Sequence, residues 1–391
     1  MDPVALDRLT DLASVLSEDE ILARDTVRQF VAEQYLPIIG DHFEAHTFPV
    51  HLIPALADLG VFGASIKGYG CAGINAVTYG LILQELEYGD SGLRSFVSVQ
   101  GSLAMYAIYN SGSEEQKQYW LPRMAQGEKI GCFGLTEPDS GSDPGSMRTM
   151  AHKDGDSYVL NGAKMWITNA PICDIAVVWA KLEEDHPQAI RGFLVERGTS
   201  GFETPTISKK MSLRASHTGE IVLSNCRIPA ENLLPNSQGL RSPLSCLNQA
   251  RFGIAWGAMG AAKACFDSAL SYSRERIQFG VPIASKQLIQ EQLVEMALEI
   301  SKAQIMNYHF ARLKEQDRLT PVQVSMAKKN SVREALKVAR MARSIHGATG
   351  ISLEFPPIRH MLNLESVYTY EGTDEIHTLS IGHALTGTNA F

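Results

Sequence analysis

Apolar residues recur every three to four positions in the first third of the chain, which is the spacing of amphipathic helices. One such helix is predicted to begin at Ser17, where Ser17 and Glu20 form a capping-box pattern, and to end at Pro37. Its apolar face is formed by Ala23, Val27, Phe30 and Val31. Further helices are predicted over about 76–88 and over much of 95–109. The N-terminal part of the chain is therefore expected to be helical.

The pattern changes near Gly131 to short apolar runs separated by turn residues, which is typical of β-strands. The dipeptide Asn161-Gly162 favours a tight hairpin turn between the first two of these runs. Strands are expected at 158–160, 164–167, 175–180, 192–195 and 220–223. A β domain is therefore predicted in the middle of the chain.

Helical periodicity returns after about Asn236 and continues toward the end of the chain. Thr320, Pro321 and Gln323 form an N-terminal capping pattern, and Gly347 is expected to end that helix. The apolar stripe of this helix is formed by Val332, Ala335, Leu336, Ala339 and Ala342.

The elements thus follow the order α, then β, then α, which predicts an α+β fold. The expected domains are 1–130, 131–236 and 237–391. Because no long Gly- or Pro-rich linker separates them, we expect the three parts to pack into one body.

Composition and charge narrow the possible classes of protein. Apolar residues make up 45% and charged residues 20% of the chain, as in globular proteins, which excludes a disordered or fibrous chain. A net charge of −8 without a basic block argues against a nucleic-acid partner. The uncharged stretch 95–113 contains Ser, Gln, Gly and Asn, so it indicates a buried helix and no membrane span.

The N-terminus and the cysteines bear on the compartment. The first residues include acidic side chains where a secretory or organellar targeting segment carries basic ones. The six cysteines lie far apart without a C-x-x-C pair, which argues against a disulfide framework or a zinc site. A reducing compartment fits, and we expect a cytoplasmic protein.

Three short motifs have simpler explanations than the chemistry they resemble. The G-x-G-x-x-G pattern at 68–73 does not follow a strand of a doubly wound sheet, so a glycine loop between two helices explains it better than a dinucleotide site. The string G-D-S-G at 89–92 resembles a serine-hydrolase motif but lies at the end of a helical pattern. His42 and His46 could share a helix face, yet no acidic ligand completes a zinc site.

Three other segments combine the residue types of a ligand site. The segment 132–143 concentrates hydroxyls, small residues and free backbone N–H groups, which suit a polar ring edge and a phosphate. An aromatic plane stands beside a hydroxyl at 166–169, and a carboxylate is flanked by aromatic residues and a glycine at 368–375. Taken singly, each segment is also explained as a loop or as solvated surface.

Together and in this order, the segments resemble the acyl-CoA dehydrogenase family over nearly the whole chain. The strings that carry the resemblance are L-T-E-P-x-x-G-S-D at 135–143, W-I-T-N at 166–169, Y-E-G-T at 370–373 and R-E-R-I-Q-F-G at 274–280, with Gln287. The segments 93–95, 248–257 and 385–391 are most similar to the branch of the family that oxidises and decarboxylates glutaryl-CoA. The resemblance implies a β-barrel-like or β-sandwich middle domain and a C-terminal four-helix bundle.

The resemblance also implies noncovalently bound FAD. The residues it assigns to the flavin and pyrophosphate are Phe133, Leu135, Thr136, Gly141, Ser142, Trp166, Ile167, Thr168, Thr373 and Glu375. Those it assigns to the adenine half of a neighbouring subunit's cofactor, within a homotetramer, are Arg276, Phe279, Gln287, Ile345, Gly347 and Ala348. The family commonly has Gly-Gly-x-Gly where this chain has Gly-Ala-Thr-Gly, so the methyl group of Ala348 limits the backbone approach to phosphate.

For the substrate, the resemblance assigns the role of general base to Glu371, which takes the α-proton of an acyl-CoA. The residues it assigns to substrate binding are Arg94, Ser95, Ser98, Ser142, Leu244, Asn248, Arg251, Tyr370 and Gly372. Arg94 is expected to bind the distal carboxylate of a glutaryl group, and the alternative is a surface ion pair of Arg94 with Glu87 or Asp90.

The implied reaction converts glutaryl-CoA to crotonyl-CoA and CO2, with electrons passed to electron-transferring flavoprotein. Glu87, Arg94, Thr168 and Tyr370 resemble the polar set of decarboxylating members. Two alternatives stay open: a short-chain acyl-CoA dehydrogenase for a monocarboxylic substrate, and a non-catalytic acyl-CoA-binding or scaffold protein with the same fold.

Overall fold

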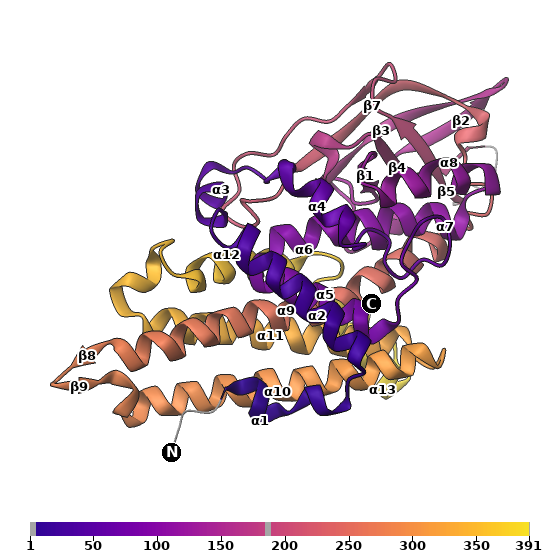
Figure 1. Ribbon diagram of the computed structural model, residues 1–391. Helices are drawn as coiled ribbons and strands as arrows, with labels where there is room; N and C mark the ends of the chain where they lie inside the picture. Colours follow the sequence, from indigo (N-terminus) through magenta and orange to yellow (C-terminus); the bar gives the residue numbers. More distant parts are fainter. Residues whose placement is uncertain (1–4, 184–188, 391) are drawn as a thin grey trace.

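The computed structural model describes residues 5–183 and 189–390. Figure 1 shows a curled sheet at one end of the molecule and long helices at the other, with the N-terminal helices packed against both. This is the predicted α+β arrangement. In the described part of the chain, no helix is both long and apolar enough to cross a membrane.

The N-terminal helices begin and end close to where the sequence predicts them. Ser17 caps the N-terminus of its helix, with its side chain accepting from the Glu20 amide and the Glu20 carboxylate accepting from the Ser17 amide. This helix continues through a π-helical turn to Tyr35, just before Pro37. The helices are α1 (Leu6–Thr10), α2 (Glu18–Phe30), α3 (Ile39–Ala45), α4 (Ile53–Asp58), α5 (Ala76–Gly89), α6 (Ser91–Ser98), α7 (Tyr106–Ser111) and α8 (Glu114–Ala125).

The stretch predicted as a helix over 95–109 consists of α6, a π-helical turn and α7 without a break. The π turn, Val99–Met105, is fully buried, and sequence periodicity did not indicate it. The glycine pattern at 68–73 lies in the loop between α4 and α5, as expected. Asp90 of the G-D-S-G string caps α6 by accepting from the Gly92 amide.

The middle of the chain forms a seven-stranded sheet in the order β1-β4-β2-β3-β7-β6, with β5 paired to the other side of β4. β1 and β2 run parallel to β4, whereas the remaining pairs are antiparallel. The strands are β1 (Gly131–Gly134), β2 (Met150–Asp154), β3 (Ser157–Thr168), β4 (Ile175–Leu182), β5 (Ile190–Glu196), β6 (Phe202–Glu203) and β7 (Thr218–Pro229).

The predicted hairpin turn at Asn161-Gly162 is wrong, because β3 continues through both residues. Their register with β7 is irregular: between the pairs at 160 and 162, β3 advances by two residues while β7 advances by three. The Asn161 side chain accepts from the Asn225 amide at this bulge, at 2.7 Å. The hairpin instead turns at Gly155, where φ is +61°. Long-range pairing with β7 thus overrides the local turn preference of Asn-Gly.

The C-terminal region is built from long helices. They are α9 (Arg241–Glu275), α10 (Gln287–Glu315), α11 (Pro321–Ile345), α12 (Pro356–Thr369) and α13 (Asp374–Thr386), and a small hairpin of β8 (Ile277–Gln278) and β9 (Val281–Pro282) joins the first two. The capping box at Thr320 and Gln323 is present, and α11 ends just before Gly347, as predicted. Phe391, the last residue of the terminal string at 385–391, lies outside the described residues, as do 1–4.

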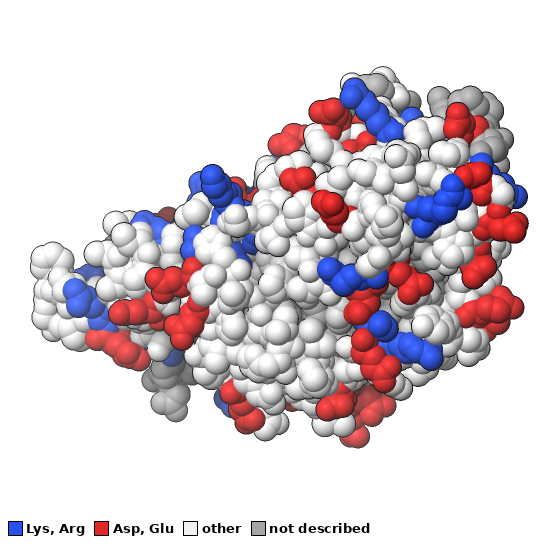
Figure 2. Space-filling view, turned by 90° about the horizontal axis from the view of Figure 1, so that it is seen from above, with Lys and Arg blue, Asp and Glu red and all other residues white. Residues whose placement is uncertain are grey.

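Charged side chains are distributed over the surface without a dominant block. Figure 2 shows Lys and Arg mixed with Asp and Glu on the face that it presents, around a broad area without charge. Inside the molecule, one apolar cluster lies under the N-terminal helices, one in the helical bundle and one in the sheet. The residues predicted to bind ligands lie where these parts meet or at their rims.

Candidate active site

Glu371 lies in the short segment between α12 and α13, at a point where the backbone leaves helical geometry. Its φ is +50° and that of Gly372 is +96°, a conformation that favours glycine. A Cβ atom at 372 would lie 2.8 Å from Nε2 of His377, so glycine is required there for space as well. This tight turn sets the direction of the Glu371 side chain before α13 begins at its N-cap, Thr373.

One oxygen of the Glu371 carboxylate is held away from water, and the residue as a whole is half-buried. Its Oε2 is buried and has no hydrogen-bond partner among the described residues. Burial raises the pKa of Glu371, and the neighbouring cations Arg94, Arg251 and Lys328 oppose that rise. A carboxylate with a raised pKa and a free oxygen is suited to accept a proton from a ligand.

Two of these cations hold the backbone around Glu371. Nε of Arg251 donates to the Glu371 carbonyl at 2.6 Å. Nζ of Lys328 donates to the carbonyls of Tyr370 at 3.1 Å and of Gly372 at 2.8 Å. Arg251 comes from α9 and Lys328 from α11, so two helices of the bundle fix this segment.

Arg94 lies in a buried ion pair. Its Nε is 2.6 Å from Oε2 of Glu87, and the side chains of Arg94 and Glu87 are 1% and 0% exposed. Its Nη2 donates to the Tyr370 hydroxyl, which Ser95 Oγ also approaches at 3.4 Å. The alternative of a surface pair is wrong in its location, but Glu87 is the partner. Arg94 thus has a counterion within the chain before any substrate binds.

Asp90, the other proposed partner of Arg94, is engaged elsewhere. Its Oδ2 accepts from Arg359 at 2.6 Å and from Asn363 at 2.8 Å, both on α12. Arg94 therefore donates from Nε to Glu87 and from Nη2 to Tyr370. Its Nη1 has no partner within 5–183 and 189–390. That group is free to donate to a ligand.

A glycine on α9 leaves space for this ion pair where α9 packs against α5. A Cβ atom at Gly257 would lie 2.1 Å from Oε2 of Glu87 and 3.1 Å from Nε of Arg94. A glycine at 257 thus lets α9 approach the pair directly. Burial raises the pKa of Tyr370 to about 12, with Arg94 opposing the rise, so its hydroxyl stays protonated at neutral pH.

The remaining residues predicted for the substrate lie on α6 and α9. Ser98 is buried, and its hydroxyl has no described partner. Leu244, Asn248 and Arg251 follow one another at helical spacing on α9, so they share the face that reaches the Glu371 segment through Arg251.

The two predicted flavin segments in the sheet are tied together by a buried ion pair. Lys164 Nζ on β3 lies 2.8 Å from Oε1 of Glu137 and 3.2 Å from the Leu135 carbonyl, and the two side chains are 0% and 6% exposed. The Met165 amide donates to the Thr136 carbonyl at 2.9 Å. The L-T-E-P string is thus held against the strand that leads to Trp166.

Trp166 presents its ring at the surface of this region. Its side chain is 56% exposed and its φ is +63°, so β3 changes direction there. Phe133, Leu135 and Ile167 are buried beneath, and Thr168 is paired with Thr218 of β7. An exposed indole above an ordered strand end is suited to cover a flat ring system.

The loop that follows the L-T-E-P string is open. Gly141 and Ser142 are exposed, and a Cβ atom at 141 would meet nothing within 4 Å. Loop hydroxyls and N–H groups in this position are accessible to a phosphate. The predicted residues in the middle of the chain therefore fit a flavin nucleotide. Thr373 caps α13, and Glu375 is exposed in its first turn.

The residues assigned to a neighbouring subunit's cofactor lie at a separate place. Figure 1 shows the β8–β9 hairpin projecting from the bundle, at the opposite side of the molecule from the sheet. Arg276, Phe279 and Gln287 are exposed in and beside this hairpin, and Phe279 is 93% exposed. Gly347 and Ala348 are exposed after α11, whereas Ile345 is buried. This placement leaves these residues available to a second molecule.

Several polar residues near the site were not predicted. Lys328, Lys164 and His377 are among them, and His377 is buried with neither ring nitrogen partnered by any described residue. One signal could have found Lys328, because it stands one turn before Val332 on the predicted apolar stripe of α11. A charged residue in an apolar stripe indicates a buried polar contact.

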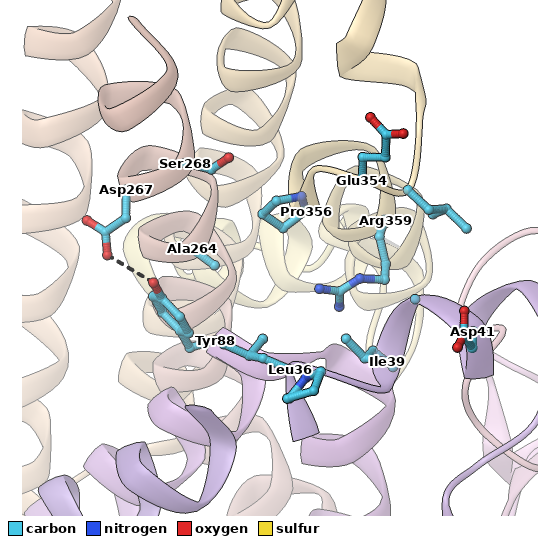
Figure 3. A pocket seen from close by; sticks show the side chains of 13 residues that line it. Leu36, Ile39, Asp41, Tyr88, Ala264, Asp267, Ser268, Glu354, Pro356 and Arg359 are labelled. Carbon is cyan, nitrogen blue, oxygen red and sulfur yellow. Dashed lines mark hydrogen bonds between the residues drawn. The ribbon is translucent and has the colours of Figure 1, made fainter. Parts of the chain in front are cut away.

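A cavity of about 510 Å³ lies apart from these residues, between α3, α5, α9 and α12. Figure 3 shows Arg359 and Tyr88 lining it, with the Tyr88 hydroxyl donating to Asp267 at 3.3 Å. None of the residues predicted for cofactor or substrate lines this cavity. It is therefore not part of the site around Glu371.

Family models match almost the whole chain. They are the acyl-CoA dehydrogenase N-terminal domain at residues 17–128, the middle domain at 132–226 and the C-terminal domain at 237–386. The mitochondrial short-chain specific acyl-CoA dehydrogenase of Rattus norvegicus is 34% identical over 374 residues, which covers 95% of this chain and 91% of that protein.

Two solved structures give higher identities. A glutaryl-CoA dehydrogenase from Mycobacterium smegmatis superimposes with a TM-score of 0.97 at 53% identity, covering 100% of both chains. A second structure of a glutaryl-CoA dehydrogenase from that organism, in complex with FADH2, superimposes with a TM-score of 0.97 at 51% identity, again over 100% of both chains.

Proposed function

The chain belongs to the acyl-CoA dehydrogenase family, and from this premise we propose that it oxidises and decarboxylates glutaryl-CoA to crotonyl-CoA and CO2. The observation that carries the proposal is the buried Arg94, which contacts Tyr370 beside the general base and keeps Nη1 free. A guanidinium at this place matches the distal carboxylate of a glutaryl group.

The enzyme is FAD-dependent, as its relative with bound FADH2 supports. The residues that hold the cofactor in this proposal are those of the open loop at 141–142, the L-T-E-P string and Trp166. When bound, FAD supplies the acceptor for the hydride that leaves the β-carbon of the substrate.

Glu371 takes the α-proton. A thioester α-hydrogen is weakly acidic, so the base needs a raised pKa and a fixed position relative to the acyl chain. Burial provides the first condition, and the contacts of Arg251 and Lys328 to the surrounding backbone support the second. The backbone N–H of Glu371 is the chain's donor to the thioester oxygen, where negative charge develops.

Arg94 binds the distal carboxylate, and Ser95 and Ser98 lie on the same helix. The ion pair with Glu87 neutralises part of the Arg94 charge, which weakens the Coulomb attraction for a substrate carboxylate. Hydrogen bonds from Nη1 of Arg94 to that carboxylate are therefore needed as well. After oxidation, the carboxylate of glutaconyl-CoA leaves as CO2, and its bonding electrons pass into the conjugated thioester. The protonated Glu371 then returns its proton, which gives crotonyl-CoA.

The second candidate is a short-chain acyl-CoA dehydrogenase for a monocarboxylic substrate. The Glu87 contact favours it, because Arg94 then already has its counterion and serves only the protein. The 34% identity to the short-chain enzyme of Rattus norvegicus also supports this candidate. The higher identity to glutaryl-CoA dehydrogenase over the full chain favours glutaryl-CoA.

Electron-transferring flavoprotein is the proposed acceptor of the electrons, and a homotetramer the proposed assembly, both by analogy with the family. The exposed hairpin with Arg276 and Phe279 then reaches the adenine half of a neighbouring subunit's cofactor.

A product assay tests the proposed function. Purified protein, reconstituted with FAD, is incubated with glutaryl-CoA and an artificial electron acceptor, and crotonyl-CoA and CO2 are measured. We expect both products in equal amounts. Turnover of butyryl-CoA without turnover of glutaryl-CoA would establish the second candidate. Failure to retain FAD after supplementation would point to a non-catalytic protein.

A further inference from the structure

We propose that Lys328 is a positioning residue, which fixes the segment that carries the general base by donating to three of its backbone carbonyls. The proposal rests on the role of Glu371 in the proposed function and assigns a residue that the family strings do not include. It concerns the backbone on both sides of Glu371.

The geometry of Lys328 is unusual for a lysine. Its Nζ lies 3.4 Å from the carbonyl oxygen of Tyr368, 3.1 Å from that of Tyr370 and 2.8 Å from that of Gly372. An ammonium group has three N–H donors, so these three acceptors match its full capacity. The carbonyls belong to the end of α12 and to the turn in which Glu371 and Gly372 adopt positive φ. One side chain thus spans the whole turn.

Burial makes this arrangement costly unless all three bonds form. Lys328 is 1% exposed and has no carboxylate within ion-pair distance in the described part of the chain. Its neighbour Lys329 behaves differently, because its Nζ pairs with Asp374 at 2.6 Å. A buried ammonium group that is satisfied by carbonyls alone holds them in one arrangement, since a displaced carbonyl would leave a buried N–H unpaired.

The same lysine acts on Glu371 through its charge. The ionisable groups that interact with Lys328 are Glu371, Arg251 of α9, Arg94 of α6, and Asp374 and His377 of α13. Burial lowers the pKa of Lys328 to about 7, with Glu371 opposing that change and Arg251 adding to it. In its charged form, Lys328 favours the carboxylate form of Glu371. Position and protonation of the base are therefore both coupled to this side chain.

Two variants separate these effects, and Lys329→Met is the matched control. Lys328→Met removes the donors and the charge. Lys328→Gln removes the charge but keeps two N–H donors, on a side chain one atom shorter, for the three carbonyls. We expect kcat per bound flavin to fall by about 100-fold in Lys328→Met with KM changed less than about threefold, since a small displacement of a catalytic group has effects of this size. Lys329→Met stays within about threefold of the wild type in both constants.

For Lys328→Gln we expect a smaller loss of kcat and an acid limb of the kcat/KM profile that moves to higher pH. The direction follows because loss of a positive charge raises the pKa of Glu371, and the base acts only when deprotonated. Amide hydrogen exchange of the holoenzyme gives a readout without turnover. Exchange at 370–372 is expected to accelerate by at least about tenfold in Lys328→Met and to stay unchanged in Lys329→Met.

The role is overturned if Lys328→Met retains kcat per bound flavin within about threefold, or if exchange at 370–372 is unchanged. An equal loss of kcat in Lys329→Met also overturns it, because the effect is then not specific to the three carbonyls. If glutaryl-CoA is not a substrate, the kinetic comparison is made with butyryl-CoA, so an incorrect substrate and an incorrect role for Lys328 give different results.

Discussion

At the scale of single residues, the site is defined by the carboxylate of Glu371, whose pKa is shifted in opposite directions by burial and by nearby cations. Glu371 is half-buried with its Oε2 out of contact with water, which disfavours its charge, but Arg94, Arg251 and Lys328 favour the charge. Burial has the larger effect, so the pKa is raised. Each cation also makes a second contact. Arg251 and Lys328 donate to backbone carbonyls around Glu371, and Arg94 donates to the Tyr370 hydroxyl.

The raised pKa of Glu371 predicts the pH dependence of activity. We expect the acid limb of kcat/KM to lie at higher pH than for an ordinary glutamate, because the base must be deprotonated. Initial rates from about pH 5 to about pH 9 check this. Glu371→Gln is the control: it should stay yellow and bind acyl-CoA while kcat falls by about 10⁴-fold. Activity retained in that variant would place the base elsewhere.

The same shift predicts an effect on stability with a definite sign. The folded state holds the proton of Glu371 more tightly than the unfolded chain, so burying the carboxylate lowers stability at neutral pH. This penalty is relieved as the pH falls through the raised pKa. Thermal unfolding of the apoprotein should therefore show Glu371→Gln to be more stable than the wild type near pH 8, with the difference vanishing below about pH 4. A less stable variant at pH 8 would contradict the assignment.

Arg94 separates the two candidate substrates. Arg94→Met alone leaves the Glu87 charge buried without a counterion, with only the Ser91 hydroxyl donating to it, which costs about 3 kcal/mol of stability. The double variant Arg94→Met/Glu87→Gln avoids that charge. In it we expect kcat/KM for glutaryl-CoA to fall by at least about 100-fold and that for butyryl-CoA to change less than about fivefold. Parallel losses with both substrates would favour the monocarboxylic candidate.

At the scale of elements, buried charges join segments that are distant in the sequence. Glu137 accepts from Lys164 on β3 and from the amides of Arg148 at 2.6 Å and Thr149 at 2.9 Å. Lys164 favours the ionised form of Glu137 and lowers its pKa, although burial opposes this. The pair therefore holds the L-T-E-P string, the loop after it and β3 in one arrangement.

We expect Glu137→Ala to lower the free energy of unfolding by about 3 kcal/mol, because it leaves the Lys164 ammonium buried and unpaired. It should also weaken FAD binding by about tenfold or more, which flavin fluorescence during titration of the apoprotein measures. Asp154→Ala is the matched control, since it breaks the exposed pair with Arg227 in the same sheet and should change neither quantity. Unchanged FAD affinity in Glu137→Ala would show that the pair only stabilises the sheet.

At the scale of the whole molecule, the chain presents an exposed apolar hairpin far from its sheet. Phe279 is 93% exposed at the hairpin, and Ile277 is 51% exposed beside it. Isolated apolar residues on a surface are common, but a projecting hairpin that carries two of them is suited to contact another molecule. In the proposed homotetramer, that molecule is a second copy of the chain.

Phe279→Ser tests this assembly. We expect the variant to fold but to retain less FAD and to shift toward smaller oligomers in light scattering coupled to gel filtration. Leu22→Ser is the control, because Leu22 is 65% exposed on α2, away from the hairpin. If Phe279→Ser keeps the oligomeric state and FAD content of the wild type, the hairpin is not part of the interface.

Local signals in the sequence predicted most of the elements. The capping boxes at Ser17 and Thr320 and the end of α11 before Gly347 are present as expected, because these signals act within one helical turn. The Asn161-Gly162 hairpin failed because strand pairing with β7 outweighed a two-residue preference. The domain boundaries and the roles of the predicted site residues stay predictions.

The sequence by itself determined the order of helices and strands, the family and the identity of the acid at 371, because these depend on short strings and on periodicity. The tertiary structure decided the state of that acid. Its pKa depends first on burial, which raises it, and then on Arg94, Arg251 and Lys328, which come from three different helices and lower it, and both effects depend on distances in space. The partner of Arg94 and the carbonyl contacts of Lys328 were decided in the same way, since only folding brings those groups together.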